Sequence, residues 1–145
     1  MRHRVKKIKL SRDYDHKRAL QKNLLKSFLK RGKIETTKPR ALVAQRLVER
    51  VISRSQSGGL SARRYLYQLL QDQKWVNHLI DNVFPQLKEK KSGFTKLRRV
   101  KIRKGDGSVI YRLEFAKDIS LERPDKGEDA DKDKKNKKSK SNKKS

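Results

Sequence analysis

The chain contains no cysteine, only three prolines, and no long apolar run among its 145 residues. The absence of cysteine excludes disulfides, thiolate metal sites and a cysteine nucleophile. No segment approaches the roughly 18 consecutive apolar residues of a membrane span, and the first residues lack the apolar core of a signal peptide. We therefore expect a soluble protein without a membrane partner.

Acidic residues are scarce relative to basic ones. The chain has 42 Lys and Arg against 16 Asp and Glu, which gives a formal net charge of +26. Of these residues, 31 basic and 9 acidic ones precede position 117, so the first 116 residues carry +22. A chain with this charge repels itself in isolation, so the expected partner is a polyanion such as a nucleic acid.

Signatures of catalysis and of cofactor binding are missing. The three histidines, His3, His16 and His78, have no metal-ligand spacing. The glycines at Gly58-Gly59 and around Asp106 match neither a phosphate-binding loop nor a dinucleotide fingerprint, so we interpret them as turns. We predict that the chain is not an enzyme and has no cofactor, metal or small-molecule substrate.

The first predicted helix runs to about Arg31, with Ser11 or Asp13 as its N-cap and Gly32 as its stop. Its apolar residues recur at the spacing of one helix face: Leu20, Leu24, Leu25, Phe28 and Leu29. Basic residues recur four apart along another face: Arg18, Lys22, Lys26 and Lys30. Since like charges so spaced destabilise a helix, this stripe favours contact with RNA over a merely solvated surface.

Three more helices and a strand are predicted up to Pro85. The β-branched segment Lys33 to Thr37 predicts a short strand, and Pro39 opens a helix that ends in the Ser/Gly loop at 53–59. The next helix is capped by Ser61 and carries Arg63 and Arg64 in its first turn, where an anion would offset the helix dipole. The last begins at Asp72 or Gln73, ends near Pro85 and has Trp75 as the expected core anchor.

The final predicted element is an antiparallel hairpin. Its strands are Phe94 to Arg103 and Val109 to Phe115, joined by a glycine-containing turn. Strict alternation in the first strand would place Val100 and Ile102 on one face. The same alternation would place three cations on the other face: Arg99, Lys101 and Arg103.

The resulting order, α-β-α-α-α-β-β, predicts an α+β fold with a helix layer on a small mixed or antiparallel sheet. Residues 1–10 are predicted to be a basic N-terminal arm, and residues 11–116 the single domain. Residues 117–145 contain the other seven acidic residues of the chain, followed by a run of Lys, Asn and Ser. We expect this segment to be a disordered, low-complexity charged tail.

Several motifs in the same order carry a resemblance to a known family. They are Met1-Arg2-His3-Arg4, Leu10-x-Arg12, His16-Lys17-Arg18-Ala19-Leu20, Ile34-Glu35-Thr36-Thr37-Lys38, Arg63-Arg64, Ser92-Gly93-Phe94-Thr95-Lys96 and Arg103-x-Gly105-Asp106. Over residues 1 to about 116 the chain resembles the bacterial large-subunit ribosomal protein seventeen family. It departs from the family pattern at Ser92, Phe94 and Lys96, where a Gly, a Tyr and an Arg are typical.

The resemblance implies a structural constituent of the large ribosomal subunit that binds large-subunit rRNA through phosphate and shape contacts and supports assembly near the polypeptide exit tunnel. Its partners would be that rRNA and neighbouring large-subunit proteins. Its location would be a cytoplasmic or, as an open alternative, an organellar ribosome. A nucleoid or architectural DNA-binding protein would have a similar composition and is the rival hypothesis.

We assign candidate rRNA contacts to basic residues of the arm, of the first and third helices and of the hairpin. They are Arg2, His3, Arg4, Lys6, Lys7, Lys9, Arg12, His16, Arg18, Lys22, Arg63, Arg64, Arg99, Lys101 and Arg103. The basic start could also resemble a mitochondrial transit peptide, but its dense lysines favour an RNA-binding arm.

Overall fold

The computed structural model describes residue 8 and residues 10–121. The predicted arm, apart from Ile8 and Leu10, and the tail from residue 122 lie outside the described residues. Within the described part, none of the helices has the length and apolar character needed to cross a membrane.

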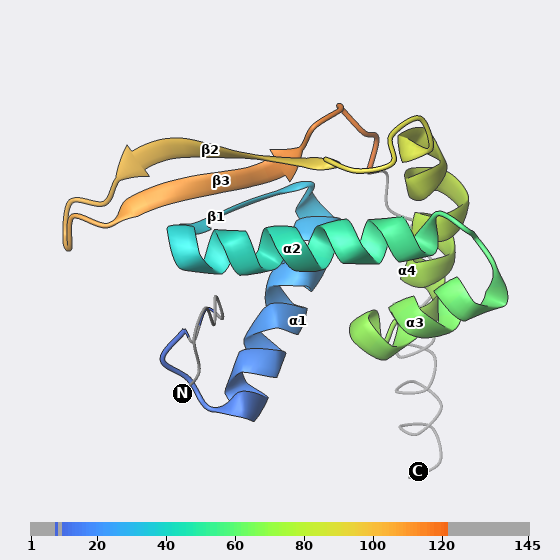
Figure 1. Ribbon diagram of the computed structural model, residues 1–145, viewed down its shortest axis with the longest axis horizontal. Helices are drawn as coiled ribbons and strands as arrows, with labels where there is room; N and C mark the ends of the chain where they lie inside the picture. Colours follow the sequence, from blue (N-terminus) through green and yellow to red (C-terminus); the bar gives the residue numbers. More distant parts are fainter. Residues whose placement is uncertain (1–7, 9, 122–145) are drawn as a thin grey trace, which may run out of the picture.

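The elements follow the predicted order and confirm the α+β class (Figure 1). In chain order they are α1 Tyr14–Arg31, β1 Lys33–Thr37, α2 Lys38–Ser55, α3 Leu60–Leu70, α4 Gln73–His78, a π-helical turn Leu79–Val83, a 3-10 turn Phe84–Leu87, β2 Thr95–Ile102 and β3 Val109–Phe115. As predicted, α1 begins after Asp13 and ends at Gly32, whose left-handed conformation closes the helix.

The three strands form an antiparallel sheet in the order β1-β3-β2. The central strand β3 therefore joins two segments that are far apart in the sequence, with Ile34 of β1 opposite Leu113. Helix α2 lies along one face of this sheet, and α1 crosses beneath α2 (Figure 1). This arrangement is the two-layer architecture that the sequence predicted.

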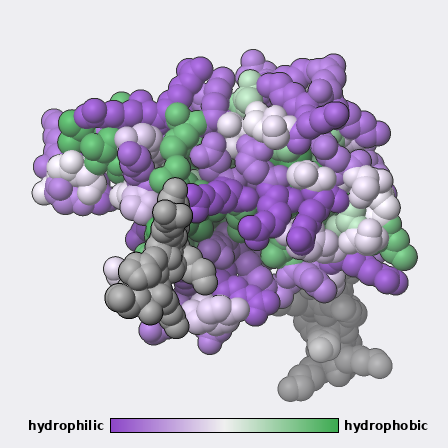
Figure 2. Space-filling view, viewed as in Figure 1, coloured by the Kyte–Doolittle hydropathy of each residue, from purple (hydrophilic) through white to green (hydrophobic). Residues whose placement is uncertain are grey.

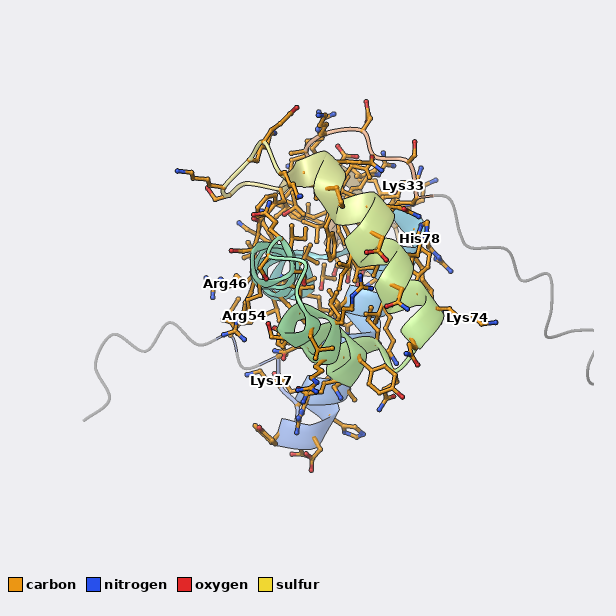
Figure 3. All side chains as sticks on the ribbon, turned by 90° about the vertical axis from the view of Figure 1, so that its right-hand side faces the viewer. Lys17, Lys33, Arg46, Arg54, Lys74 and His78 are labelled. Atoms are coloured by element: carbon orange, nitrogen blue, oxygen red, sulfur yellow. The ribbon has the colours of Figure 1, made fainter. Side chains whose placement is uncertain are left out.

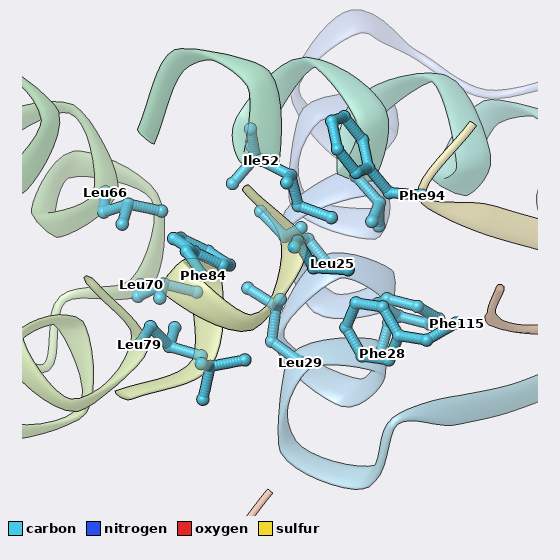
Figure 4. Packing of buried hydrophobic residues seen from close by; sticks show 14 of the residues in the cluster. Leu25, Phe28, Leu29, Ile52, Leu66, Leu70, Leu79, Phe84, Phe94 and Phe115 are labelled. Carbon is cyan, nitrogen blue, oxygen red and sulfur yellow. The ribbon is translucent and has the colours of Figure 1, made fainter. Parts of the chain in front are cut away.

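The core lies between the sheet and the helices (Figure 4). Phe28 of α1 contacts Phe115 of β3, with ring centroids 4.6 Å apart. Leu66 of α3 and Phe84 of the 3-10 turn extend the same cluster toward the other end of the molecule. Trp75 is 6% exposed and belongs to this cluster, which confirms its predicted role as a core anchor.

One predicted helix cap was wrong, and the last predicted helix changes type before it ends near Pro85. Helix α3 begins at Leu60 with Gly59 as its N-cap, so Ser61 lies inside the helix and does not cap it. The helical path after α4 continues past Pro85 to Leu87, because the chain passes through a π-helical turn into a 3-10 turn. Proline sits in the first turn of that 3-10 segment, where its missing N–H removes no internal hydrogen bond.

Core packing continues beyond Ala116. Ile119 and Leu121 are half-buried and pack against the core cluster. A methyl group added at Gly32 would lie 2.7 Å from Cδ1 of Leu121, so this segment closely covers the end of α1. Lys117 also forms an ion pair with Glu89 at 2.9 Å.

Candidate nucleic-acid interface

Most acidic side chains in the described chain are bonded within the fold. Asp72 accepts a hydrogen bond from the backbone N–H of Trp75 and caps α4. The other bonded carboxylates, apart from Glu49, hold cations: Asp81 holds Arg63, Glu35 holds Arg112, Glu89 holds Lys117, Asp106 holds Arg103, and Glu114 holds Lys96 and Arg98. These pairs lie on the sheet, in the hairpin turn, between α3 and the π-helical turn, and between the segments that follow Leu87 and Phe115. Within the described part of the chain, none of them is formed by a cation of α1 or α2.

Three of these ion pairs lower the pKa of their carboxyl group. The hydrogen bond from Arg112 lowers the pKa of Glu35, and the hydrogen bond from Lys117 does the same to the pKa of Glu89. At the hairpin turn, Arg103 and then Ser108 hold the pKa of Asp106 far below its ordinary value. At neutral pH these three carboxylates neutralise Arg112, Lys117 and Arg103 within the fold, although the sheet and turn still contain more Lys and Arg than Asp and Glu.

Only one acidic residue lies in α2, and it points toward the sheet. Glu49 accepts hydrogen bonds from the backbone N–H groups of Phe94 and Thr95, at 3.2 and 2.9 Å, and from the Thr95 hydroxyl at 2.7 Å. Its carboxylate is therefore engaged at the start of β2. It forms no ion pair with Arg46, Arg50 or Arg54, the arginines that follow one another along α2.

A groove between α1 and α2 gathers several of these cations. It is lined by Ile8, Lys17, Gln21, Val43, Arg46, Leu47 and Arg50, and we call it the α1/α2 groove. Figure 3 shows Lys17, Arg46 and Arg54 on the same side of the molecule. Among the described residues, Lys17, Arg46 and Arg50 have no acidic partner. Hydrophilic side chains dominate the face shown in Figure 2.

The cations of the α1/α2 groove are not among the contacts predicted from the sequence. Arg46, Arg50 and Arg54 recur four apart, which is a detectable signal of a basic helix face. Their convergence with Lys17 depends on how α1 crosses α2, and one-dimensional spacing does not contain that information.

The predicted basic residues of α1 lie on a different flank from this groove. Lys22, Lys26 and Lys30 follow one side of α1, whereas Lys17 and Gln21 line the side that faces α2. Arg12 and His16 are exposed just before and within the first turn. The structure therefore presents two cationic surfaces on α1, the groove and the stripe Arg18, Lys22, Lys26 and Lys30.

The two arginines predicted to bind phosphate together, Arg63 and Arg64, have different surroundings in the structure. The Arg63 guanidinium donates to Asp81 Oδ1 and Asn77 Oδ1, each at 2.6 Å. Arg64 is exposed and has no partner among the described residues. Of the two, only Arg64 presents an uncompensated charge.

The prediction that Arg99, Lys101 and Arg103 share one face of the hairpin was wrong. A β-bulge between Arg99 and Lys101 shifts the register, so Arg99 pairs with Tyr111 and Lys101 with Ile110, which are on opposite faces of β3. Arg103 is held within the turn by Asp106, with its Nε 2.7 Å from Oδ1. For the same reason Val100 and Ile102 remain exposed, at 39% and 54%, and do not share a buried face.

The remaining predicted contacts, Arg2, His3, Arg4, Lys6, Lys7 and Lys9, lie outside the described residues. Their neighbour Ile8 is half-buried in the α1/α2 groove. Across residue 8 and residues 10–121, no cluster of three or more His, Asp or Glu side chains is arranged to hold a metal ion.

The chain is similar to known proteins over most of its length. The family model of ribosomal protein L17 matches residues 20–116. The chain is 38% identical to the large ribosomal subunit protein bL17 of Campylobacter lari over 115 residues, which cover 79% of this chain and 98% of the relative. It is 40% identical to the protein of the same name from Clostridium perfringens over 107 residues, which cover 74% and 95%. The chain therefore belongs to the ribosomal protein L17 family.

Proposed function

We propose that this protein is a structural, non-enzymatic constituent of the large ribosomal subunit that binds large-subunit rRNA and supports subunit assembly. The observation that carries the proposal is the distribution of ion pairs. Among the described residues, the ion-paired acids hold cations of the sheet, the hairpin turn, α3 and the segment after β3, and none of them pairs with a cation of α1 or α2. Such a surface gains free energy by releasing counterions from RNA phosphates.

The α1/α2 groove is the proposed principal phosphate-binding surface. Lys17 comes from α1, and Arg46 and Arg50 come from α2. The crossing of the two helices therefore fixes their relative positions, so that together they can follow the curvature of an RNA backbone. Ile8, which belongs to the predicted basic arm, lines this groove. Arm residues 2–9 would add further phosphate contacts, and the α1 stripe with Arg64 would form secondary ones.

Its position would be on a cytoplasmic ribosome, against rRNA and neighbouring large-subunit proteins near the polypeptide exit tunnel. Membership in a family of ribosomal proteins supports this placement over an architectural DNA-binding role. The domain limits proposed for binding are residues 11–116, with the segment up to Leu121 packed onto them.

The test is sedimentation of the tagged full chain from cell extract through sucrose gradients, before and after a high-salt wash. We expect the protein to remain with large subunits after the wash, because a ribosomal component is enclosed by both RNA and protein contacts. A protein that leaves the subunits and is recovered with genomic DNA would contradict the proposal and support the architectural role.

A further inference from the structure

A small hollow lies between α3 and α4, away from the α1/α2 groove. Its apolar lining comes from Leu60, Tyr67 and Val76, and its polar lining includes Arg63, Arg64 and Asn77. Leu60 and Tyr67 are 63% and 52% exposed, which is unusual for large apolar side chains in so charged a chain. Val76 is buried, so it can form only the base of the hollow.

The spacing of residues on α3 explains why these side chains meet. Leu60, Arg64 and Tyr67 recur at four and three residues, so they share one face of the helix. The buried face of the helix is formed by Ala62, Leu66 and Leu70, which are four residues apart. The exposed face is therefore not needed for the core of this domain.

We propose that this hollow binds a single unpaired base of the large-subunit rRNA, a site that rests on the proposed rRNA-binding function. Unpaired bases in folded RNA are recognised by stacking on aromatic rings or on the planes of arginine guanidinium groups. Tyr67 offers an exposed ring. The Arg63 guanidinium is fixed by Asn77 and Asp81, and its side chain remains 34% exposed, so it offers an oriented plane.

Charge favours RNA over a protein segment as the occupant. Arg64 lines the hollow, has no acidic partner among the described residues and can hold the phosphate that joins the bound base to the next nucleotide. Asp81 is occupied by Arg63, and Asp72 caps α4, so both nearby carboxylates are engaged. Asn77 accepts from Arg63 through its oxygen, which orients its amide NH₂ group as a donor for a base edge.

The experiment uses the full chain and an in vitro transcript of the large-subunit rRNA, with dimethyl sulfate probing of unpaired bases. Tyr67→Ala is compared with Tyr67→Phe, which keeps the ring, and with Tyr14→Ala, which removes an exposed tyrosine outside the hollow. We expect Tyr67→Ala alone to re-expose a base protected by the unchanged protein and to weaken binding roughly 5- to 100-fold. Because tyrosine is uncharged, the salt dependence of binding should not change.

The inference is overturned if Tyr67→Ala binds the transcript as tightly as the unchanged protein and alters no base reactivity. If that variant nevertheless fails to enter large subunits in cells, the hollow contacts a protein. Failure of the unchanged chain to bind the transcript would overturn the proposed function and this site together, so the two failures are distinguishable. Melting temperatures of all three variants confirm that each is folded.

Discussion

The carboxylate of Glu49 on α2 accepts two hydrogen bonds from Thr95, one from its backbone N–H at 2.9 Å and one from its hydroxyl at 2.7 Å. A third bond, from the backbone N–H of Phe94, completes the contact. These residues are far apart in the sequence, and Thr95 is buried. The contact anchors the first residue of β2 to the helix that lies beneath the sheet.

Removing this carboxylate should destabilise the fold. We expect Glu49→Ala to lower the free energy of unfolding by about 2 kcal/mol, because two backbone N–H groups and a buried hydroxyl lose their acceptor. Urea denaturation followed by circular dichroism measures the change. Glu49→Gln keeps one acceptor oxygen and should cost less, so equal losses in the two variants would contradict this account.

Alanine substitution at two glycines with left-handed backbone can distinguish the cost of backbone strain from the cost of a steric clash. Gly32 and Gly58 have φ values of +73° and +66°, but only Gly32 has a neighbour, Leu121, in the space that a methyl group would fill. We expect Gly58→Ala to cost about 1 kcal/mol from backbone strain alone. Gly32→Ala should cost clearly more in the same urea titration, because Leu121 must also move. Equal costs would show that Leu121 does not cover Gly32.

Truncation tests the end of the domain. A chain ending at Leu121 should unfold with nearly the full stability, whereas one ending at Ala116 should lose about 2 kcal/mol, because Ile119 and Leu121 no longer cover the core. Both chains should still enter large subunits, since the proposed RNA surfaces precede residue 117. Loss of incorporation by a chain that ends at Ala116 and remains folded would instead make the removed tail a specific anchor.

The long-range contacts explain what the sequence could and could not predict. The bounds of α1 and β1 follow from local signals: Asp13 at the N-cap position, although its side chain makes no capping hydrogen bond, the stop at Gly32, and the β-branched residues that follow. The partner of Arg63 could not be read in this way, because Asp81 approaches it only after α3 and α4 pack together. Similarly, the bulge after Arg99 has no glycine to mark it, and it reverses the predicted facing of Lys101.

The hairpin turn should respond to acid. Since Arg103 lowers the pKa of Asp106 in the folded state, the unfolded chain takes up the proton first, with a pKa of about 3.9. The stabilisation is therefore complete above roughly pH 5 and is lost as the pH falls through the unfolded pKa toward the lower folded pKa. We expect Arg103→Gln to raise the pKa of Asp106 toward its ordinary value in an NMR titration of the side-chain carboxyl. An unchanged pKa would show that Ser108 alone is responsible.

The most direct test of RNA binding by the uncompensated cations is the salt dependence of affinity for the large-subunit rRNA transcript. The triple variant Lys17→Gln, Arg46→Gln, Arg50→Gln removes three charges from the α1/α2 groove. The matched control Lys96→Gln, Arg112→Gln, Lys117→Gln removes three charges that are paired with Glu114, Glu35 and Glu89. Both variants change the net charge equally, so any difference between them reports location.

The quantity to compare is the slope of log binding constant against log salt concentration. The account predicts that the groove variant lowers the magnitude of this slope by about 2 to 3, at roughly 0.7 to 0.9 per phosphate contact, while the control variant changes it by less than about 1. Equal decreases in both variants would mean that net charge alone governs binding. That result would contradict the assignment of the α1/α2 groove as the principal RNA-binding surface.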